Sequence, residues 1–186
     1  FIIMSSELRV DKIIPVDGVP TGGGGGVIQI VDVGTTTEQT ITSGTPTTVL
    51  TASITPKFST SKIRIELNIF AYHMNYYDGY VGLFRGSSST VITGASQGSY
   101  SDTSSIILRQ GSFEDQTGNG DYQCNPTYYS YLDTAGTTSQ ISYVAKAHGN
   151  GGSSYPTYIN RSHSRGQSNN NFPKLRSTLT LTEYSA

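Results

Sequence analysis

Charge, aliphatic side chains and cysteine are all scarce in this chain of 186 residues. Charged residues make up 13% of it, and 12 Lys and Arg against 13 Asp and Glu leave a net charge of -1. This balance excludes the basic face of a nucleic-acid-binding protein and the acidic block of a charged tail. The single cysteine, Cys124, excludes an internal disulfide framework and is typical of a chain made in a reducing cytosol. No apolar run approaches the roughly 20 residues of a membrane-spanning helix, so we expect no membrane insertion.

Strand-forming residues are abundant where helix formers are few. Hydrophobic residues reach 34%, 13 of them are tyrosine, and 21 glycines stand among many serines and threonines. Tyr, Thr, Val and Ile favour strands, whereas helices are built mainly from Ala, Leu, Glu, Lys and Arg. The composition therefore predicts an all-β protein.

The segment from Lys62 to Ala71 shows the strand pattern most clearly. Ile63, Ile65 and Leu67 alternate with polar residues there, and a period of two with one apolar face indicates a half-buried strand. Ten such segments are expected, at residues 27–33, 47–55, 62–71, 79–84, 90–92, 105–108, 127–132, 140–147, 156–159 and 178–184. About ten strands separated by turn residues predict an antiparallel β-sandwich or jelly roll.

The chain divides into three regions of different composition. Residues 1–21 combine aliphatic and charged side chains with Pro15 and Pro20, which disfavour a helix, and they predict an extended arm. Five glycines at residues 22–26 predict a flexible joint, and residues 27–186 form the β head domain. The first three residues precede a methionine, and two alternatives stay open for them: a start at Met4 or an incomplete chain.

Signatures of catalysis and metal binding are weak. The segment Gly94–Gly98 matches the Gly-x-Ser-x-Gly elbow of a nucleophilic serine, but no helix is predicted after it, as that motif requires. Glu114 and Asp115 are adjacent and would point to opposite faces of a strand, so they do not form a pair for glycan cleavage. The three histidines lie far apart, without the clustered ligands of a zinc site. We therefore expect no enzyme activity, no cofactor and no metal ion.

Tyrosine is the most informative residue type for function. A rigid apolar ring with a polar tip suits a binding surface when it stands on a loop beside small polar residues. We expect Tyr129, Tyr131 and Tyr143 to be core or sheet residues instead. The candidates for contact with a receptor are Tyr72, Tyr76, Tyr77 and Asp78.

Several segments resemble a known family of proteins. The stretch from Leu8 to Thr21, followed by glycines, resembles the start of fibre-like virion proteins of marine tailed bacteriophages. The segments at residues 82–87, 131–138, 158–162 and 177–183 are similar to body motifs of that family, such as its aromatic-Arg-Gly-Ser turn. The resemblance covers most of the chain, and the arm is its most specific part.

The resemblance implies a virion component made in the bacterial host cytoplasm. In that family the N-terminal arm docks on other virion proteins and the β head projects outward, commonly as a homotrimer. The head is similar to tumour-necrosis-factor-like jelly rolls in size and strand count. The residues expected to anchor the arm are Leu8, Val10, Ile13, Ile14, Pro15, Val16, Val19 and Pro20.

The leading functional hypothesis is a structural fibre protein whose head attaches to the host surface. Its ligand would be a surface glycan or protein, and several copies would strengthen weak binding by each head. One alternative is a decoration fibre of the capsid or neck with no receptor role. A second alternative, a polysaccharide-degrading tailspike, lacks sequence repeats and a credible carboxylate pair.

Overall fold

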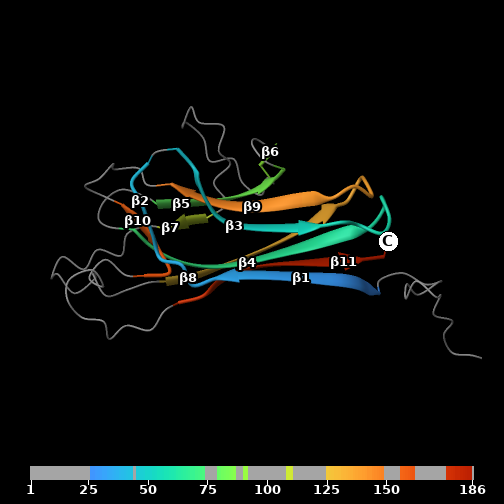
Figure 1. Ribbon diagram of the computed structural model, residues 1–186, viewed down its shortest axis with the longest axis horizontal. Helices are drawn as coiled ribbons and strands as arrows, with labels where there is room; N and C mark the ends of the chain where they lie inside the picture. Colours follow the sequence, from blue (N-terminus) through green and yellow to red (C-terminus); the bar gives the residue numbers. More distant parts are fainter. Residues whose placement is uncertain are drawn as a thin grey trace, which may run out of the picture.

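The computed structural model describes residues 26–43, 45–73, 79–86, 90–91, 108–110, 125–148, 156–161 and 175–185. These residues form eleven strands and no helix, arranged as two antiparallel sheets that face each other (Figure 1). The expected all-β class and sandwich architecture are therefore confirmed. The eight anchoring residues of the arm, with Tyr76, Tyr77 and Asp78, lie outside the described residues.

One sheet has six strands, and β4 is its central element. Strand β8 pairs with one edge of β4, while β11 and then β10 pair with the opposite edge; β1 adds to β11 and β2 to β10. The strands are β1 (Val27–Thr35), β2 (Gln39–Ile41), β4 (Lys62–His73), β8 (Asn125–Thr134), β10 (Thr157–Ile159) and β11 (Ser177–Tyr184).

The second sheet has five strands in the order β3-β9-β5-β6, with β7 also paired to β5. Its strands are β3 (Thr47–Ile54), β5 (Gly79–Arg85), β6 (Thr90–Val91), β7 (Leu108–Gln110) and β9 (Ile141–His148). The chain crosses between the sheets at every step from β2 to β5 and from β7 to β10, whereas β1–β2, β5–β7 and β10–β11 each stay within one sheet. Such crossings between two facing antiparallel sheets are typical of a β-sandwich.

The core lies between the sheets and follows the predicted alternation. Ile63, Ile65, Leu67 and Ile69 of β4 are fully buried, whereas Arg64 faces outward and is exposed. Burying each of these aliphatic side chains contributes roughly 1.5–3 kcal/mol to folding. The tyrosines expected in the sheets are also confirmed there, because the core cluster contains Tyr143 and packs against Tyr129 and Tyr131.

All ten expected segments coincide with or overlap strands, and the missed strand is β2. Its three residues are too few to show a period of two, and only Ile41 among them is buried. Of the expected segment at residues 105–108, the structure describes only Leu108, the first residue of β7, and residues 105–107 lie outside the described residues.

An ion pair and a tyrosine hydroxyl connect the two sheets. Arg85 of β5 donates from Nη1 to Oδ2 of Asp133 in β8 over 2.8 Å, and the hydroxyl of Tyr143 in β9 donates to the same oxygen over 2.8 Å. Arg85 also donates to the backbone oxygens of Thr134 and Ala135, which follow Asp133. We call Arg85, Asp133 and Tyr143 the inter-sheet network.

A second polar group lies where β4 exchanges β11 for β10 as its partner. The backbone N–H of Asn160 donates to the Phe70 oxygen over 2.9 Å, and the Phe70 N–H donates to Oγ of Ser177 over 3.0 Å. The Ser177 hydroxyl donates to Oδ1 of Asn160 over 2.6 Å, and Nδ2 of Asn160 donates to the oxygens of Thr35 and Thr37. Asn160 is fully buried and has a φ of 59°, a left-handed conformation that asparagine tolerates better than most residues. We call this group the strand junction.

Tyr143 gives the head a testable response to alkaline pH. Burial, and then its hydrogen bond to Asp133, raise the pKa of Tyr143 above its usual value. The unfolded chain loses this proton near pH 10, about the ordinary tyrosine pKa, while the fold retains it. Stability from Tyr143 is therefore fully present below about pH 10 and is lost as pH rises further.

We expect Tyr143→Phe to cost about 1 kcal/mol at neutral pH through the lost hydrogen bond. The deficit should shrink above pH 10 by up to about 1.4 kcal/mol per pH unit, because the variant lacks the titrating group. Urea unfolding at a series of pH values between 7 and 11 gives the free energy of unfolding of the native protein and of the variant. A deficit that stays constant across this series would contradict the expected linkage.

Candidate binding surface

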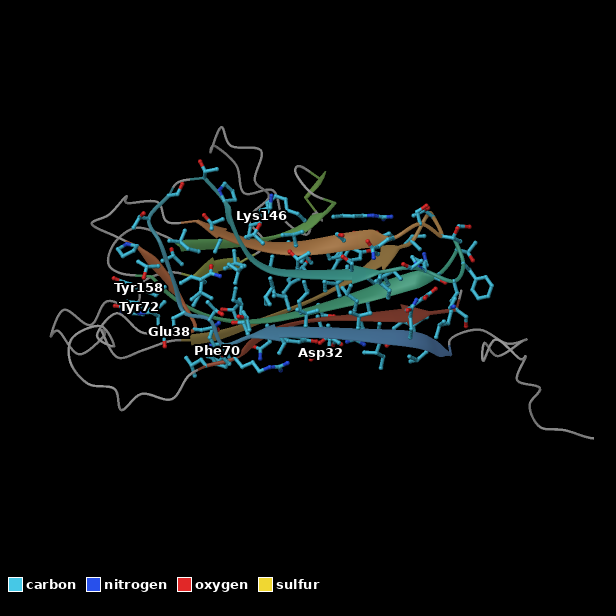
Figure 2. The ribbon with its side chains drawn as sticks, in the orientation of Figure 1. Asp32, Glu38, Phe70, Tyr72, Lys146 and Tyr158 are labelled. Carbon is cyan, nitrogen blue, oxygen red and sulfur yellow. The ribbon has the colours of Figure 1, made fainter. Side chains whose placement is uncertain are left out.

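Tyr72 is the sequence-predicted receptor candidate that the structure describes. It stands near the end of β4 and lies directly opposite Tyr158 of β10. The two rings stack with centroids 6.1 Å apart, and the guanidinium of Arg161 lies 4.9 Å above the Tyr158 ring. Figure 2 shows both tyrosines at one end of the sandwich. We call Tyr72, Tyr158 and Arg161 the Tyr72 cluster.

The three side chains of this cluster have different roles. Tyr158 is only 8% exposed, so its ring supports the cluster from below and offers little surface to a ligand. Tyr72 and Arg161 are half-buried and reach the surface. Tyr72 stacks on Tyr158, whose own ring is in cation–π contact with Arg161. The stacking restricts the Tyr72 ring, which lowers the conformational entropy lost when a ligand packs on it.

The contact of Tyr72 with Tyr158 and Arg161 could not be predicted from the sequence. Tyr158 and Arg161 lie in the segment at residues 158–162, which the sequence distinguishes only by its family resemblance. Alternation within β4 and β10 tells which face each residue occupies, but the pairing of these two distant strands is a tertiary property.

The head has a clear polarity along β4. Cross-strand register places Val27 of β1 and Tyr184 of β11 beside Lys62, at the start of β4. The N–H of Ser185 donates to the oxygen of Gly26 over 3.1 Å, so both ends of the described chain meet there. Tyr72 lies ten positions further along β4, about 33 Å away at the usual rise of a strand. Figure 1 shows the start of β1 and the C-terminus at the end opposite β10.

A buried carboxylate stabilises the end of the sandwich at which β1 begins. Glu183 of β11 has no exposed surface, and it accepts hydrogen bonds from Nε2 of Gln29 over 2.5 Å and from the N–H of Lys57 over 2.7 Å. These bonds tie β1 and the β3–β4 connection to β11. The first strand is thereby fixed to the body of the sandwich.

Comparison of the chain with models of protein families, and with curated proteins, finds no match. In the described part of the chain, no three residues of the metal-ligating types gather into a cation site. Across the same residues, no helix has the length and apolar character needed to cross a membrane.

The face of the six-stranded sheet that points away from the core is the second exposed surface, and we call it the outer face. Asp32 accepts hydrogen bonds from Oγ1 of Thr180 over 2.6 Å and from Nη2 of Arg176 over 3.2 Å. These two bonds, the Thr180 bond first, lower the pKa of Asp32. The Arg176 guanidinium passes over Gly34, where any side chain would collide with it. Because both partners are exposed, this ion pair adds little stability.

The five-stranded sheet differs at its own outward surface. Phe84 and Val144 point away from the core, yet both are buried, and Nζ of Lys146 lies 4.8 Å from the Phe84 ring centroid. In the part of that sheet whose side chains are described, which leaves out β6 and β7, no large hydrophobic side chain is exposed. The two sheets therefore present unlike surfaces.

Proposed function

We propose that this chain is a structural fibre protein of a bacteriophage virion, with a β head that attaches the particle to the host surface. The arm at residues 1–21 anchors the chain to other virion proteins, and residues 22–26 join it to the head. The ligand of the head is a surface glycan or protein. The observation that supports this proposal most directly is the polarity of the head.

That polarity suits a projecting attachment module. An anchored chain enters the sandwich at Gly26, beside the end of β11, and this end is secured by the buried Glu183. The Tyr72 cluster lies at the opposite end, where it would point away from the particle. A head mounted in this way presents a rigid aromatic ring at its far end.

The proposal includes a homotrimer. Several heads on one particle raise the effective concentration of each Tyr72 cluster at the host surface after the first contact. Weak binding by a single head then suffices for stable attachment.

Replacing Tyr72 by alanine should weaken binding of the purified full-length protein to host cells by about tenfold or more, the usual effect of removing an aromatic anchor. Tyr72→Phe keeps the ring and should retain most of the binding. Phe58→Ala is the matched control, because Phe58 is an aromatic residue, 44% exposed, that precedes Ser61 at the other end of β4. Fluorescently labelled protein and flow cytometry give the binding curves. Equal binding by the Tyr72→Ala variant and the native protein would contradict a receptor role for the cluster.

A further inference from the structure

The Tyr72 cluster is the end of a longer row of side-chain rings on the outer face. Strand residues two apart share a face, so Phe70 projects beside Tyr72 from β4, on the same side as Arg64. Register places Pro126 of β8 opposite Phe70, and Tyr128 lies two positions further along β8. Figure 2 shows Phe70 further from the end of the sandwich than Tyr72. We call Tyr72, Phe70, Pro126 and Tyr128 the ring track.

The members of the ring track are close enough to contact one ligand. Side chains directly opposite each other in antiparallel strands are about 5 Å apart at Cβ, and diagonal neighbours are about 7–8 Å apart. Four positions separate the row of Tyr72 from the row of Tyr128, which is about 13 Å along the strands. Tyr72 and Phe70 are half-buried, Pro126 is exposed, and Tyr128 is 58% exposed. The track is therefore a narrow, elongated apolar surface.

The ring at each end of the track is held in place by a neighbour. Tyr72 stacks on Tyr158, with 6.1 Å between the ring centroids. The Tyr128 hydroxyl donates to Oε1 of Glu66 over 2.5 Å, and Nε of Arg64 lies 3.4 Å from the same oxygen. Because both rings are already restricted, a ligand that packs on them immobilises little additional side chain, which reduces the entropic cost of binding.

Neutral hydrogen-bonding side chains border the track. The row of Tyr128 includes Asn68 of β4, and Ser130 follows Tyr128 on the same face of β8. At the other end, Thr40 of β2 is exposed and lies opposite Tyr158. Hydroxyl and amide groups both donate and accept hydrogen bonds. The apolar track is thus flanked by groups that can pair with the hydroxyls of a ligand.

This pattern favours a glycan over other classes of partner. A sugar ring has an apolar face of C–H groups, which packs on an aromatic ring, and a rim of hydroxyls that donate and accept hydrogen bonds. A protein partner is bound most strongly through a compact, fully desolvated cluster, which a narrow track does not form. A strongly charged chain needs an excess of one sign, whereas Glu66 beside the track has Arg64 as its partner.

We propose that the head binds a glycan chain along the ring track, with one sugar on Tyr72 and another on Tyr128. This inference deepens the proposed attachment function and rests on it. It extends the contact at the far end of the head to a surface that follows β4 and β8 toward the middle of the outer face.

Tyr128→Ala should weaken binding of the full-length protein to host cells by about tenfold, as expected for an aromatic anchor. Tyr128→Phe keeps the ring and should retain most of the binding. The matched control is Leu132→Ala, because Leu132 is 57% exposed on the same strand and face but lies two rows beyond the track. Both sites are exposed, so urea midpoints should stay near the native value. Native binding by Tyr128→Ala, or equal losses in Tyr128→Ala and Leu132→Ala, would overturn the track and leave the role of Tyr72 standing.

Treatment of the host cells before binding identifies the chemical class of the ligand. Periodate cleaves the vicinal diols of sugars and should abolish binding of the native protein, whereas proteinase K should leave binding unchanged. Binding that survives periodate and is lost after proteinase K would overturn the glycan and indicate a protein receptor, with attachment intact. Absence of binding to untreated cells would instead contradict the proposed function, and this inference with it, so the two failures are distinguishable.

Discussion

Asn160→Ala is expected to lower the free energy of unfolding by about 4 kcal/mol. Alanine removes the Nδ2 donor to the oxygens of Thr35 and Thr37 and leaves the buried hydroxyl of Ser177 without its acceptor. Each lost hydrogen bond costs roughly 1 kcal/mol, and an unpaired buried group costs more. Alanine at a φ of 59° adds about 1 kcal/mol of backbone strain.

Two further substitutions separate the strain from the hydrogen bonds. Asn160→Gly accepts the left-handed conformation without a side chain, so it should cost about 1 kcal/mol less than alanine. Asn160→Asp keeps the acceptor for Ser177 but replaces the donor, and it places an oxygen against two carbonyl oxygens. Urea unfolding of the three variants gives the order. If alanine and glycine were equally stable, or if both were as stable as the native protein, the strand junction would not have the role assigned to it.

Arg85→Met is expected to lower the free energy of unfolding by about 2–3 kcal/mol. Breaking a fully buried ion pair usually costs about 3–5 kcal/mol, and the value is smaller here because these side chains keep some contact with water. The exposed fractions are 29% for the Arg85 side chain and 17% for that of Asp133. Methionine fills similar volume but leaves the carboxylate with only neutral donors, the Tyr143 hydroxyl and the N–H of Thr134. It also frees the backbone oxygens of Thr134 and Ala135.

The matched control is Lys146→Met on β9. That change also removes a cation and retains an unbranched side chain. Lys146 makes a cation–π contact with Phe84, and its loss should lower the free energy of unfolding by about 1 kcal/mol or less. Combining Arg85→Met with Asp133→Asn completes a double-mutant cycle, and the coupling energy should exceed about 1 kcal/mol. Additive effects of the two changes would show that the inter-sheet ion pair is not a stabilising interaction.

The strands were predictable because burial on one side leaves a periodic trace in the sequence. Strand β4 shows it most clearly, since Ile63, Ile65 and Leu67 face the core and the residues between them do not. In β1 the signal fails to assign the faces, because Ile28, Ile30, Val31 and Val33 are apolar on both sides. The exposed position of Ile30 followed only from the sheet pairing.

The segments that carried a family resemblance meet in pairs within the fold. Arg85 and Asp133 come from two of them and form the inter-sheet ion pair, while Asn160 and Ser177 come from two others and form part of the strand junction. These residues stabilise the sandwich and contact no exposed surface site. The segment at residues 158–162 also supplies Tyr158 and Arg161 to the Tyr72 cluster, so the resemblance covers both the architecture and the proposed binding surface.

Localisation on the virion tests the proposed function most directly. Antibodies raised against residues 27–186 would be applied to intact particles of the bacteriophage proposed to carry the chain, and gold labels located by electron microscopy. We expect label at the tail or its fibres, where the heads can reach the host. Label spread over the capsid or collar would contradict host attachment and support a decoration fibre, and particles without label, with the epitopes shown to be accessible, would contradict the virion assignment itself.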